Sequence, residues 1–261
     1  MGENNAYECG NQAERGRALL EQLPLELDPM TLRGLDQFHA GGAEPVLRLL
    51  RAGEVGEGMT VVDLGAGLGG PARLAAAAGA NVVGIDRSPG FVELATALSA
   101  RCGLSQRVSF RVGDMTSLDL PDRSADRVML IHAQMNVFDK GALARTIARI
   151  LKPGGKLLAW EICGAGASEV TWPVPWSLDG ADSHLVDADT LRSEFEKGGL
   201  HISSWEDRSE WARGWFKEAS AQPAAGPSLL ALLERGPERV QNFARGVATG
   251  QLVLIEGVAH A

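Results

Sequence analysis

The sequence predicts an α/β protein built around a mainly parallel sheet. From Val61 onward, short apolar runs alternate with longer stretches of helical periodicity, which is typical of repeated βα units. The length of 261 residues allows one large domain or two small ones. Because neither an internal repeat nor a low-complexity linker divides the chain, we expect a single domain over residues 1–261.

The central part of the chain contains the elements of this pattern. The apolar runs are expected to form strands at about residues 60–64, 82–86, 108–112, 126–132 and 156–162. The helical stretches between them lie at about residues 70–79, 90–102 and 140–151. In the last of these, Ala142, Leu143, Ile147 and Ile150 fall on one helical face. Crossovers between parallel strands are almost always right-handed, so few topologies remain.

The two ends of the chain extend this core. Two helical stretches, at residues 12–22 and 43–51, predict a helical cap over residues 1–55 that packs on a core of residues 56–165. The remainder, residues 166–261, is expected to form a lid, inserted helices and a terminal pair of strands.

The terminal strands are expected at residues 201–206, after a helix at 188–197, and at residues 251–256. About forty residues rich in Ala, Trp and Leu separate them. A structureless loop of that length is unusual in a compact domain, so we expect helices there. Strands joined in this way would complete the sheet in an antiparallel arrangement.

Charge and cysteine usage exclude several classes of function. The chain has 25 basic and 33 acidic residues, a net charge of −8, and its basic residues are scattered, so we expect no nucleic-acid partner. Cys9, Cys102 and Cys163 are far apart and lack CxxC spacing, which argues against a disulfide framework and a metal site. The polar N-terminus and the lack of a long apolar run predict no membrane partner and a cytoplasmic location.

A glycine-rich turn follows the first central strand. VVDLGAGLGGP contains Gly65, Gly67 and Gly70 at GxGxxG spacing, and such a turn before a helix offers backbone N–H groups to an anionic or polar ligand. Asp63 precedes Gly65 by two residues, and its carboxylate would repel a pyrophosphate. The same carboxylate suits a ligand that carries an ammonium and a sulfonium, such as S-adenosylmethionine (SAM), more than a nicotinamide dinucleotide.

The ends of the next two strands are also acidic. Asp86 can accept hydrogen bonds from both ribose hydroxyls, which fits NAD and SAM equally well. Asp114 can accept from an adenine amine while Met115 packs on the ring. Carboxyl ends of parallel strands meet at one edge of a sheet, so we expect Asp63, Asp86 and Asp114 to line one crevice. Each acid alone is more often a helix cap or turn residue, and only the ordered set indicates a nucleotide-type cofactor.

Five motifs carry a family resemblance, in the order DLGAGLGGPARLAA, VVGIDRS, RVGDMTSLDLPDRSADRV, HAQMNV and RILKPGGKLLAWEI. Together, over about residues 36–207, the chain resembles the class I SAM-dependent methyltransferases, in particular the small-molecule branch with the sarcosine/dimethylglycine methyltransferases and relatives of quinone-biosynthesis enzymes. The resemblance implies a Rossmann-like, doubly wound, seven-stranded sheet, mostly parallel with the last strand antiparallel. It also implies that Pro153, Gly154 and Gly155 stop a helix and turn into the fifth strand.

The resemblance further implies the residues that hold SAM. Their roles are to surround the methionyl end (Asp63, Gly65, Gly67), to take the ribose (Asp86, with Arg87 beside it), to meet the adenine (Asp114, Met115) and to face the methyl donor (His132). The fourth strand ends in IHAQMN and not in an NPPY-like motif. That departure argues against amino-group methylation of DNA bases.

Two histidines are candidates for the catalytic base. Methyl transfer is an in-line displacement, in which a base helps only if the nucleophile has a proton to lose. His132 lies at the strand end nearest the transferred methyl, with Gln134 and Asn136 beyond it as candidate substrate contacts. His39 would enter through the N-terminal cap. Either histidine could instead be satisfied by local backbone bonds.

An aromatic segment is the candidate substrate lid. In WPVPW two prolines stiffen the backbone between Trp172 and Trp176, and the indoles suit an apolar or cationic substrate. Packing against the inserted helices is the alternative. Trp211 and Trp215, four residues apart on an expected helix, indicate core packing. Tyr7 belongs to the polar N-terminal tail.

The function that these patterns predict is methyl transfer from SAM to an oxygen, nitrogen or carbon of a small metabolite, a natural-product or amine-like intermediate. A SAM-binding protein that catalyses a cyclisation or rearrangement is the first alternative, because fold does not fix chemistry. A non-catalytic SAM-binding regulator and an NAD-dependent oxidoreductase are the others. The oligomeric state, monomer or homodimer, stays open.

Overall fold

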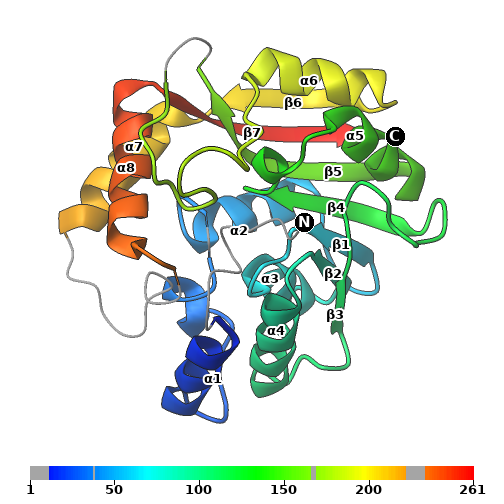
Figure 1. Ribbon diagram of the computed structural model, residues 1–261. Helices are drawn as coiled ribbons and strands as arrows, with labels where there is room; N and C mark the ends of the chain where they lie inside the picture. Colours follow the sequence, from blue (N-terminus) through cyan, green and yellow to red (C-terminus); the bar gives the residue numbers. More distant parts are fainter. Residues whose placement is uncertain (1–11, 38, 166–168, 222–232) are drawn as a thin grey trace.

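The computed structural model describes residues 12–37, 39–165, 169–221 and 233–261. Its centre is a seven-stranded sheet with helices on both faces (Figure 1). The strands are β1 (Thr60–Leu64), β2 (Asn81–Asp86), β3 (Val108–Val112), β4 (Ala125–Ile131), β5 (Leu151–Gly164), β6 (His201–Asp207) and β7 (Leu252–His260). The α-helices are α1 (Gln12–Gln22), α2 (Ala43–Ala52), α3 (Gly70–Ala77), α4 (Pro89–Arg101), α5 (Lys140–Ile150), α6 (Ala188–Lys197), α7 (Ser209–Ala221) and α8 (Gly236–Thr249). Short 3₁₀ helices are η1 (Thr31–Gly34) and η2 (Gln134–Asn136).

The strands lie in the order β3-β2-β1-β4-β5-β7-β6. From β1 the chain first adds β2 and β3 on one side and then β4 and β5 on the other, so the direction of winding reverses between β1 and β4. β1 pairs in parallel with both β2 and β4, and a ligand crevice is expected outside the carboxyl ends of strands at such a switch point. β7 inserts between β5 and β6 and is antiparallel to both. The predicted fold, including the helices inserted before the last strand, is therefore confirmed.

Two strands extend well beyond their predicted ends. β7 was expected at residues 251–256 and runs from Leu252 to His260. β5 was expected at residues 156–162 and runs from Leu151 to Gly164. Pro153–Gly155 was expected to form a turn before the fifth strand, but β5 begins at Leu151, opposite Ala125. The pairing resumes with Lys156 opposite Arg127, so residues 152–155 form an irregular bulge inside the strand. Gly154 adopts the left-handed conformation there, with a φ of 75°, which glycine reaches without a steric penalty. Pro153, Gly154 and Gly155 therefore form part of a bulge inside the strand.

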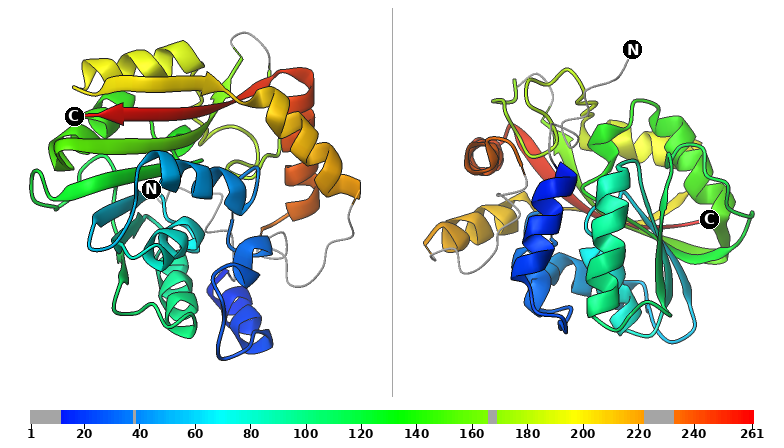
Figure 2. Two further views of the ribbon diagram at one scale, coloured as in Figure 1. Left: turned by 180° about the vertical axis from the view of Figure 1, so that it is seen from behind. Right: turned by 60° about the horizontal axis from the view of Figure 1, so that its bottom comes forward.

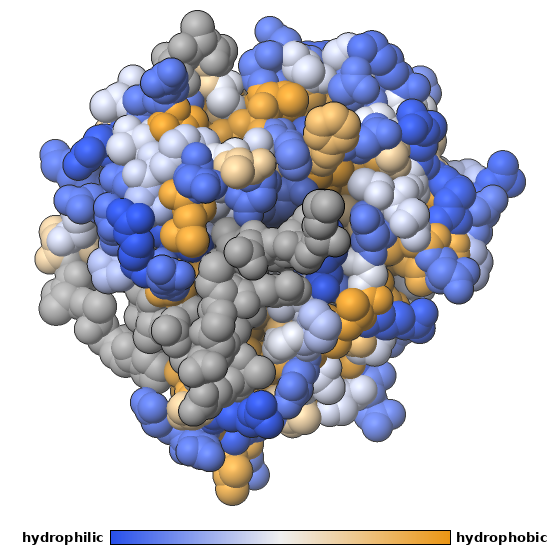
Figure 3. All heavy atoms as spheres, viewed as in Figure 1, coloured by the Kyte–Doolittle hydropathy of each residue, from blue (hydrophilic) through white to orange (hydrophobic). Residues whose placement is uncertain are grey.

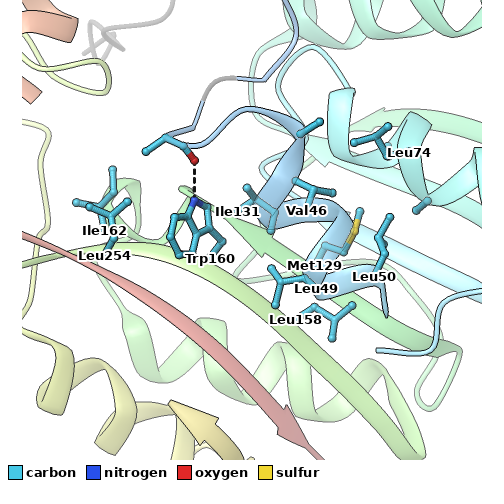
Figure 4. Packing of buried hydrophobic residues seen from close by; sticks show 14 of the residues in the cluster. Val46, Leu49, Leu50, Leu74, Met129, Ile131, Leu158, Trp160, Ile162 and Leu254 are labelled. Atoms are coloured by element: carbon cyan, nitrogen blue, oxygen red, sulfur yellow. Dashed lines mark hydrogen bonds between the residues drawn. The ribbon is translucent and has the colours of Figure 1, made fainter. Parts of the chain in front are cut away.

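Both faces of the sheet are buried, so neighbouring residues of β5 belong to different cores. Leu158 and Trp160 pack with α2 and α3 on one face, as the close view in Figure 4 shows for Val46 and Leu49. The indole N–H of Trp160 donates to the carbonyl of Ala40, 3.0 Å away. On the opposite face, the apolar side of α5 predicted from the sequence packs against β4 and β5 together with α6.

The N-terminal segment is tied to the core by polar and apolar contacts. α1 lies beside α4, as the right-hand view of Figure 2 shows, and the Arg101 guanidinium donates to the carbonyls of Leu20 and Leu23. Further along, Asp36 accepts from the fully buried Arg73 of α3 at 2.8 Å. The loop after η1 is therefore anchored next to the glycine turn.

On the part of the face in Figure 3 that is not grey, apolar residues form separate patches among hydrophilic ones. Within the described ranges, no helix has the length and hydrophobicity to cross a membrane. Among the same residues, no three His, Cys, Asp or Glu side chains are grouped as metal ligands.

Candidate active site

A cavity of about 1060 Å³ opens at the carboxyl ends of the parallel strands. Its wall includes residues from the turns that follow β1, β2, β3 and β4, from the segment of residues 175–184, and Phe243 of α8. Nine predicted site residues lie on this wall, namely Gly65, Gly67, Asp86, Arg87, Asp114, Met115, His132, Asn136 and Trp176. Asp63, His39, Gln134 and Trp172 lie elsewhere.

The glycine turn is held by the end of β2. Gly65 and Gly67 have φ values of 75° and 52°, so the backbone turns back on itself without a side chain on the wall. The amide of Gly65 donates to the Ile85 carbonyl at 2.9 Å, and that of Gly67 to the Asp86 carboxylate at 2.8 Å. The two turns therefore form one rigid floor.

Asp86 is half-buried in this floor. Its second carboxylate oxygen accepts from the Ser88 amide at 2.9 Å. Burial raises the pKa of the Asp86 carboxyl, and the hydrogen bonds from Ser88 and Gly67 oppose that shift. Each carboxylate oxygen has a second lone pair, so the group can accept further hydrogen bonds from a ligand.

Asp63 lies behind the wall, which differs from the expectation that three acids line the crevice together. Its side chain is 1% exposed, and its Oδ2 atom has no hydrogen-bond partner among the described residues. Burial, together with the nearby Asp86, raises the pKa of the Asp63 carboxyl to about 7. A cationic group bound next to the turn would stabilise the ionised form.

Asp114 and Met115 form the wall beyond the glycine turn. One oxygen of Asp114 accepts from the amide and the hydroxyl of Thr116, at 2.8 and 2.7 Å, and the side chain is exposed to the cavity mouth. Met115 is buried, and its terminal methyl group lies 3.4 Å from the place where a Cβ atom on Gly65 would stand. Gly65 thus lies in a tight place, with Met115 on one side and Ala133 on the other, 2.6 Å from the same position.

His132 ends β4 in a strained backbone conformation. Its φ is 47°, which costs a non-glycine residue free energy, and its amide donates to the Trp160 carbonyl at 2.7 Å. The imidazole stacks on Trp160, with ring centroids 6.1 Å apart, and meets Phe243 edge-on at 5.9 Å. Its Nε2 atom is buried without a hydrogen-bond partner. Burial and the neighbouring His39 hold the pKa of His132 well below its ordinary value, so the ring is neutral.

His39 stands behind His132, with ring centroids 5.8 Å apart. Its Nε2 lies 2.8 Å from Oε1 of Gln37, and the amide nitrogen of Gln37 donates to Asp36. The Nδ1 of His39 lies 3.3 Å from the carbonyl of Ala40, so each ring nitrogen faces an acceptor and the neutral ring can donate to one of them. Burial lowers the pKa of His39 to about 4. The ring therefore supports His132 from outside the cavity.

Of the other candidate substrate contacts, two lie on the cavity wall and two lie away from it. Asn136 lies on the wall, whereas Gln134 is fully buried and donates to the Ile162 carbonyl. Trp176 lies on the wall and donates to the Ser183 hydroxyl at 2.9 Å. Trp172 packs against Gly180 instead. Tyr7 and Cys9 fall outside the described residues.

Glu161 and Lys140 are buried polar groups that the sequence reasoning missed. The Glu161 carboxylate accepts from the amides of Ala133 and Gln134 at 3.1–3.4 Å. The Lys140 ammonium donates to the carbonyls of Gln134 and Val137. Burial raises the pKa of Glu161 to about 8 and lowers that of Lys140 to about 8. An acid inside the apolar run LLAWEIC was the available signal, because buried acids are rare unless they have partners.

Comparisons with known proteins agree with this geometry. A family model described as "Methyltransferase domain" matches residues 62–159. "Methyltransferase GfsG" of Streptomyces halstedii is 33% identical over 184 residues, which is 69% of this chain and 66% of that protein. A sterol 24-C-methyltransferase of Aspergillus fumigatus is 42% identical over 106 residues, 40% of this chain and 28% of that protein. The chain thus spans only part of the length of these relatives.

Solved structures share the fold. The [4+2]-cyclase SpnF is 21% identical, with a TM-score of 0.69 over all of this chain and 98% of that one. A putative sarcosine dimethylglycine methyltransferase from Galdieria sulphuraria is 18% identical, with a TM-score of 0.65 over 83% of each chain. These likenesses support the architecture alone. From its ordered motifs, its sheet topology and its sequence relatives, the chain belongs to the class I SAM-dependent methyltransferases.

Proposed function

We propose that this chain transfers the methyl group of SAM to an oxygen, nitrogen or carbon atom of a small molecule, a natural-product or amine-like intermediate, with release of S-adenosylhomocysteine. The observation that carries the proposal is one continuous cavity that joins the glycine turn to His132 and to the aromatic wall. Relatives named for methylation of sterols, phosphoethanolamine and tocopherol support a small-molecule acceptor.

The residues around the glycine turn fit SAM. The turn at Gly65 requires glycine, because an added Cβ atom would stand only 2.6 Å from the Cβ of Ala133, and the backbone amides of the turn are left without a covering side chain. The buried Asp63 oxygen without a partner favours a ligand with a positive charge nearby. A doubly anionic pyrophosphate would be disfavoured by the Asp63 carboxylate at the same place.

Each wall residue then has a role in holding the cofactor. The backbone of Gly65 and Gly67 borders its methionyl part. Asp86 accepts from the ribose hydroxyls beside Arg87, and Asp114 accepts from the adenine amine while Met115 packs on the ring. When bound, SAM supplies an electrophilic methyl carbon on a sulfonium.

His132 is the residue that acts on the acceptor. A neutral imidazole with an unpartnered Nε2 accepts a hydrogen bond from an O–H or N–H group. This contact orients the nucleophile, and the proton passes to Nε2 as the new bond to carbon forms. Trp176, Phe243 and Ile162 line the adjoining wall and exclude water there.

Calorimetry tests the cofactor half of the proposal. We expect calorimetry to detect no binding of NAD and to detect binding of S-adenosylhomocysteine. Asp86→Ala should weaken that binding at least about tenfold, because it removes a charged acceptor of hydrogen bonds. Asp122→Ala removes an exposed acid away from the cavity and serves as the matched control. Binding of NAD in preference to S-adenosylhomocysteine would reject the proposal.

Mass spectrometry of products tests the chemical half. Incubation with SAM and a panel of small hydroxyl and amine compounds should give products that gain a methyl group, together with S-adenosylhomocysteine. His132→Ala should lower turnover at least about 100-fold if the base operates and leave S-adenosylhomocysteine affinity intact. Products of unchanged mass, formed without S-adenosylhomocysteine, would indicate a cyclisation or rearrangement and reject methyl transfer.

The remaining expectations concern the setting of the enzyme. Three properties stay predictions. They are the cytoplasmic location, the monomeric or homodimeric state, and the lack of nucleic-acid and membrane partners. Light scattering of the purified protein measures the oligomeric state directly.

A further inference from the structure

The part of the cavity beyond His132 differs in charge from the part around the glycine turn. Its wall is largely apolar and includes Met135, Val137, Ile162, Trp176, Leu178 and Phe243, together with the polar side chains of Asn136 and His184. Three carboxylates, from Asp139, Asp179 and Asp182, lie among these side chains. Arg87 is the one Lys or Arg on the cavity wall as the structure describes it, and it belongs to the turn after β2.

The sequence extends this charge pattern to the segments that the structure leaves undescribed. Residues 1–11, 38, 166–168 and 222–232 contain no lysine and no arginine. None of these segments can therefore supply a basic side chain to the cavity. The acceptor side is therefore acidic and apolar, and no lysine or arginine side chain from these segments can neutralise its carboxylates.

Anionic acceptors conflict with this chemistry. Proteins bind phosphate and carboxylate groups through arginine forks, lysine ammonium groups and helix N-termini. The N-terminus of α5 is already capped by Asp139, whose carboxylate accepts from the amide of Ala142 at 2.7 Å. An added phosphate there would meet a carboxylate at close range.

Cationic acceptors are favoured by the same groups. Carboxylates at the mouth attract an ammonium, and aromatic faces of the kind presented by Trp176 and Phe243 bind cations as well as apolar groups. The buried, unpartnered Nε2 of His132 marks where the reacting atom would approach. The charge and the apolar surface thus act on the same ligand.

We propose that the methyl acceptor is an apolar amine that carries neither a phosphate nor a carboxylate group. The proposal rests on the methyltransferase function above and narrows its substrate class. An apolar skeleton lies against the aromatic wall while the amine lies toward Asp179 and Asp182. A cationic nitrogen must lose its proton before it attacks carbon. That proton passes to water at the cavity mouth, and the neutral His132 then accepts a hydrogen bond from an N–H group of the free amine and orients it.

Octylamine, octanol and octyl phosphate are probes that share one apolar chain and differ in charge. Calorimetry is carried out on the free protein and on the protein saturated with S-adenosylhomocysteine. We expect octylamine to bind at least about tenfold more tightly than octyl phosphate, with octanol in between, and the difference to shrink in 0.5 M salt by roughly the extent that screening predicts. Octyl phosphate binding as tightly as octylamine would overturn the proposal.

A charge reversal assigns the preference to the cavity mouth. Asp179→Lys changes an exposed side chain whose carboxylate only caps a local turn, at 3.0 Å from the Ala181 amide. It should weaken octylamine binding and strengthen octyl phosphate binding. Glu218→Lys makes the same change on α7, off this cavity wall, and should alter neither. Equal effects of the two variants would overturn the assignment.

The two proposals fail in different ways. If S-adenosylhomocysteine does not bind, the methyltransferase function fails while the selectivity of the free protein for octylamine still reports on the cavity. If S-adenosylhomocysteine binds and the three probes bind alike, only the substrate class is wrong.

Discussion

Gly65→Ala is the change that most directly tests how the glycine turn is built. The φ of Gly65 is 75°, and an added Cβ atom would stand 2.6 Å from the Cβ of Ala133. The substitution therefore has two costs. The left-handed conformation costs an L-residue about 1–2 kcal/mol, and overpacking against a fixed neighbour adds about 1–3 kcal/mol.

Gly58→Ala separates these two costs. Gly58 has a φ of 76°, and nothing lies within 4 Å of an added Cβ atom. It should therefore show only the backbone cost. The difference between the two variants, about 1–3 kcal/mol, is the cost of the contact with Ala133.

Thermal unfolding and ligand titration measure the two consequences. For a chain of this size, 1 kcal/mol lowers Tm by about 2–4 °C, so Gly65→Ala should melt about 2–12 °C below Gly58→Ala. Gly65→Ala should also lose S-adenosylhomocysteine binding, because the new methyl group moves the wall of the turn, while Gly58→Ala should retain it. Equal melting temperatures together with equal affinities would refute the placement of Gly65 against Ala133.

Two further predictions concern buried carboxyl groups. Asp63 has a pKa raised to about 7 by burial. Its contribution to stability is therefore full below about pH 4 and is lost as the pH rises through 7. Asp63→Asn should flatten this slope and stabilise the free protein at pH 8 by about 4 kcal/mol, since one pKa unit corresponds to about 1.4 kcal/mol. An unchanged slope in urea unfolding between pH 4 and 8 would contradict the assignment. Glu161→Leu should leave the amides of Ala133 and Gln134 without an acceptor and lower the free energy of unfolding by about 2–5 kcal/mol. Glu161→Gln retains one acceptor and should lose less; urea midpoints that rank the two variants in the opposite order would show that the carboxylate does not hold this loop.

The fold was predictable because each strand carries its own boundaries. Apolar runs that end in glycine or aspartate gave β1 and β3 at the observed residues. The exceptions are β5, where the sequence PGG is typical of a turn, and β7, which extends to His260. Leu151 joins β5 through its pairing with Ala125 before the bulge, and residues 156–164 pair with β7, about 100 residues away in the chain. Local sequence does not contain that information.

The site was predictable where topology alone places a residue. Asp86 and Asp114 follow parallel strands, and the carboxyl ends of such strands share one edge, so both lie on the cavity wall. Side-chain direction after a strand is not set by spacing, which is why Gln134 turns inward while Asn136 stays on the wall. Phe243 reaches the wall through the packing of α8, and no motif in the sequence marks it.

The loop that follows β4 joins the buried polar groups to the function. Burying Glu161 and Lys140 has a large desolvation cost, and an apolar pair would often be more stable. Here both groups form hydrogen bonds with backbone atoms of residues 133–137, which belong to the wall next to His132. His132 itself holds a strained φ of 47°, which persists only where surrounding bonds fix it. Glu161 and Lys140 hold the backbone that follows His132, and Trp160 stacks on the imidazole of His132. A loop fixed in this way keeps Nε2 of His132 in place. The free energy of unfolding that burial of Glu161 and Lys140 costs is therefore lost at the point where the reaction needs a fixed geometry.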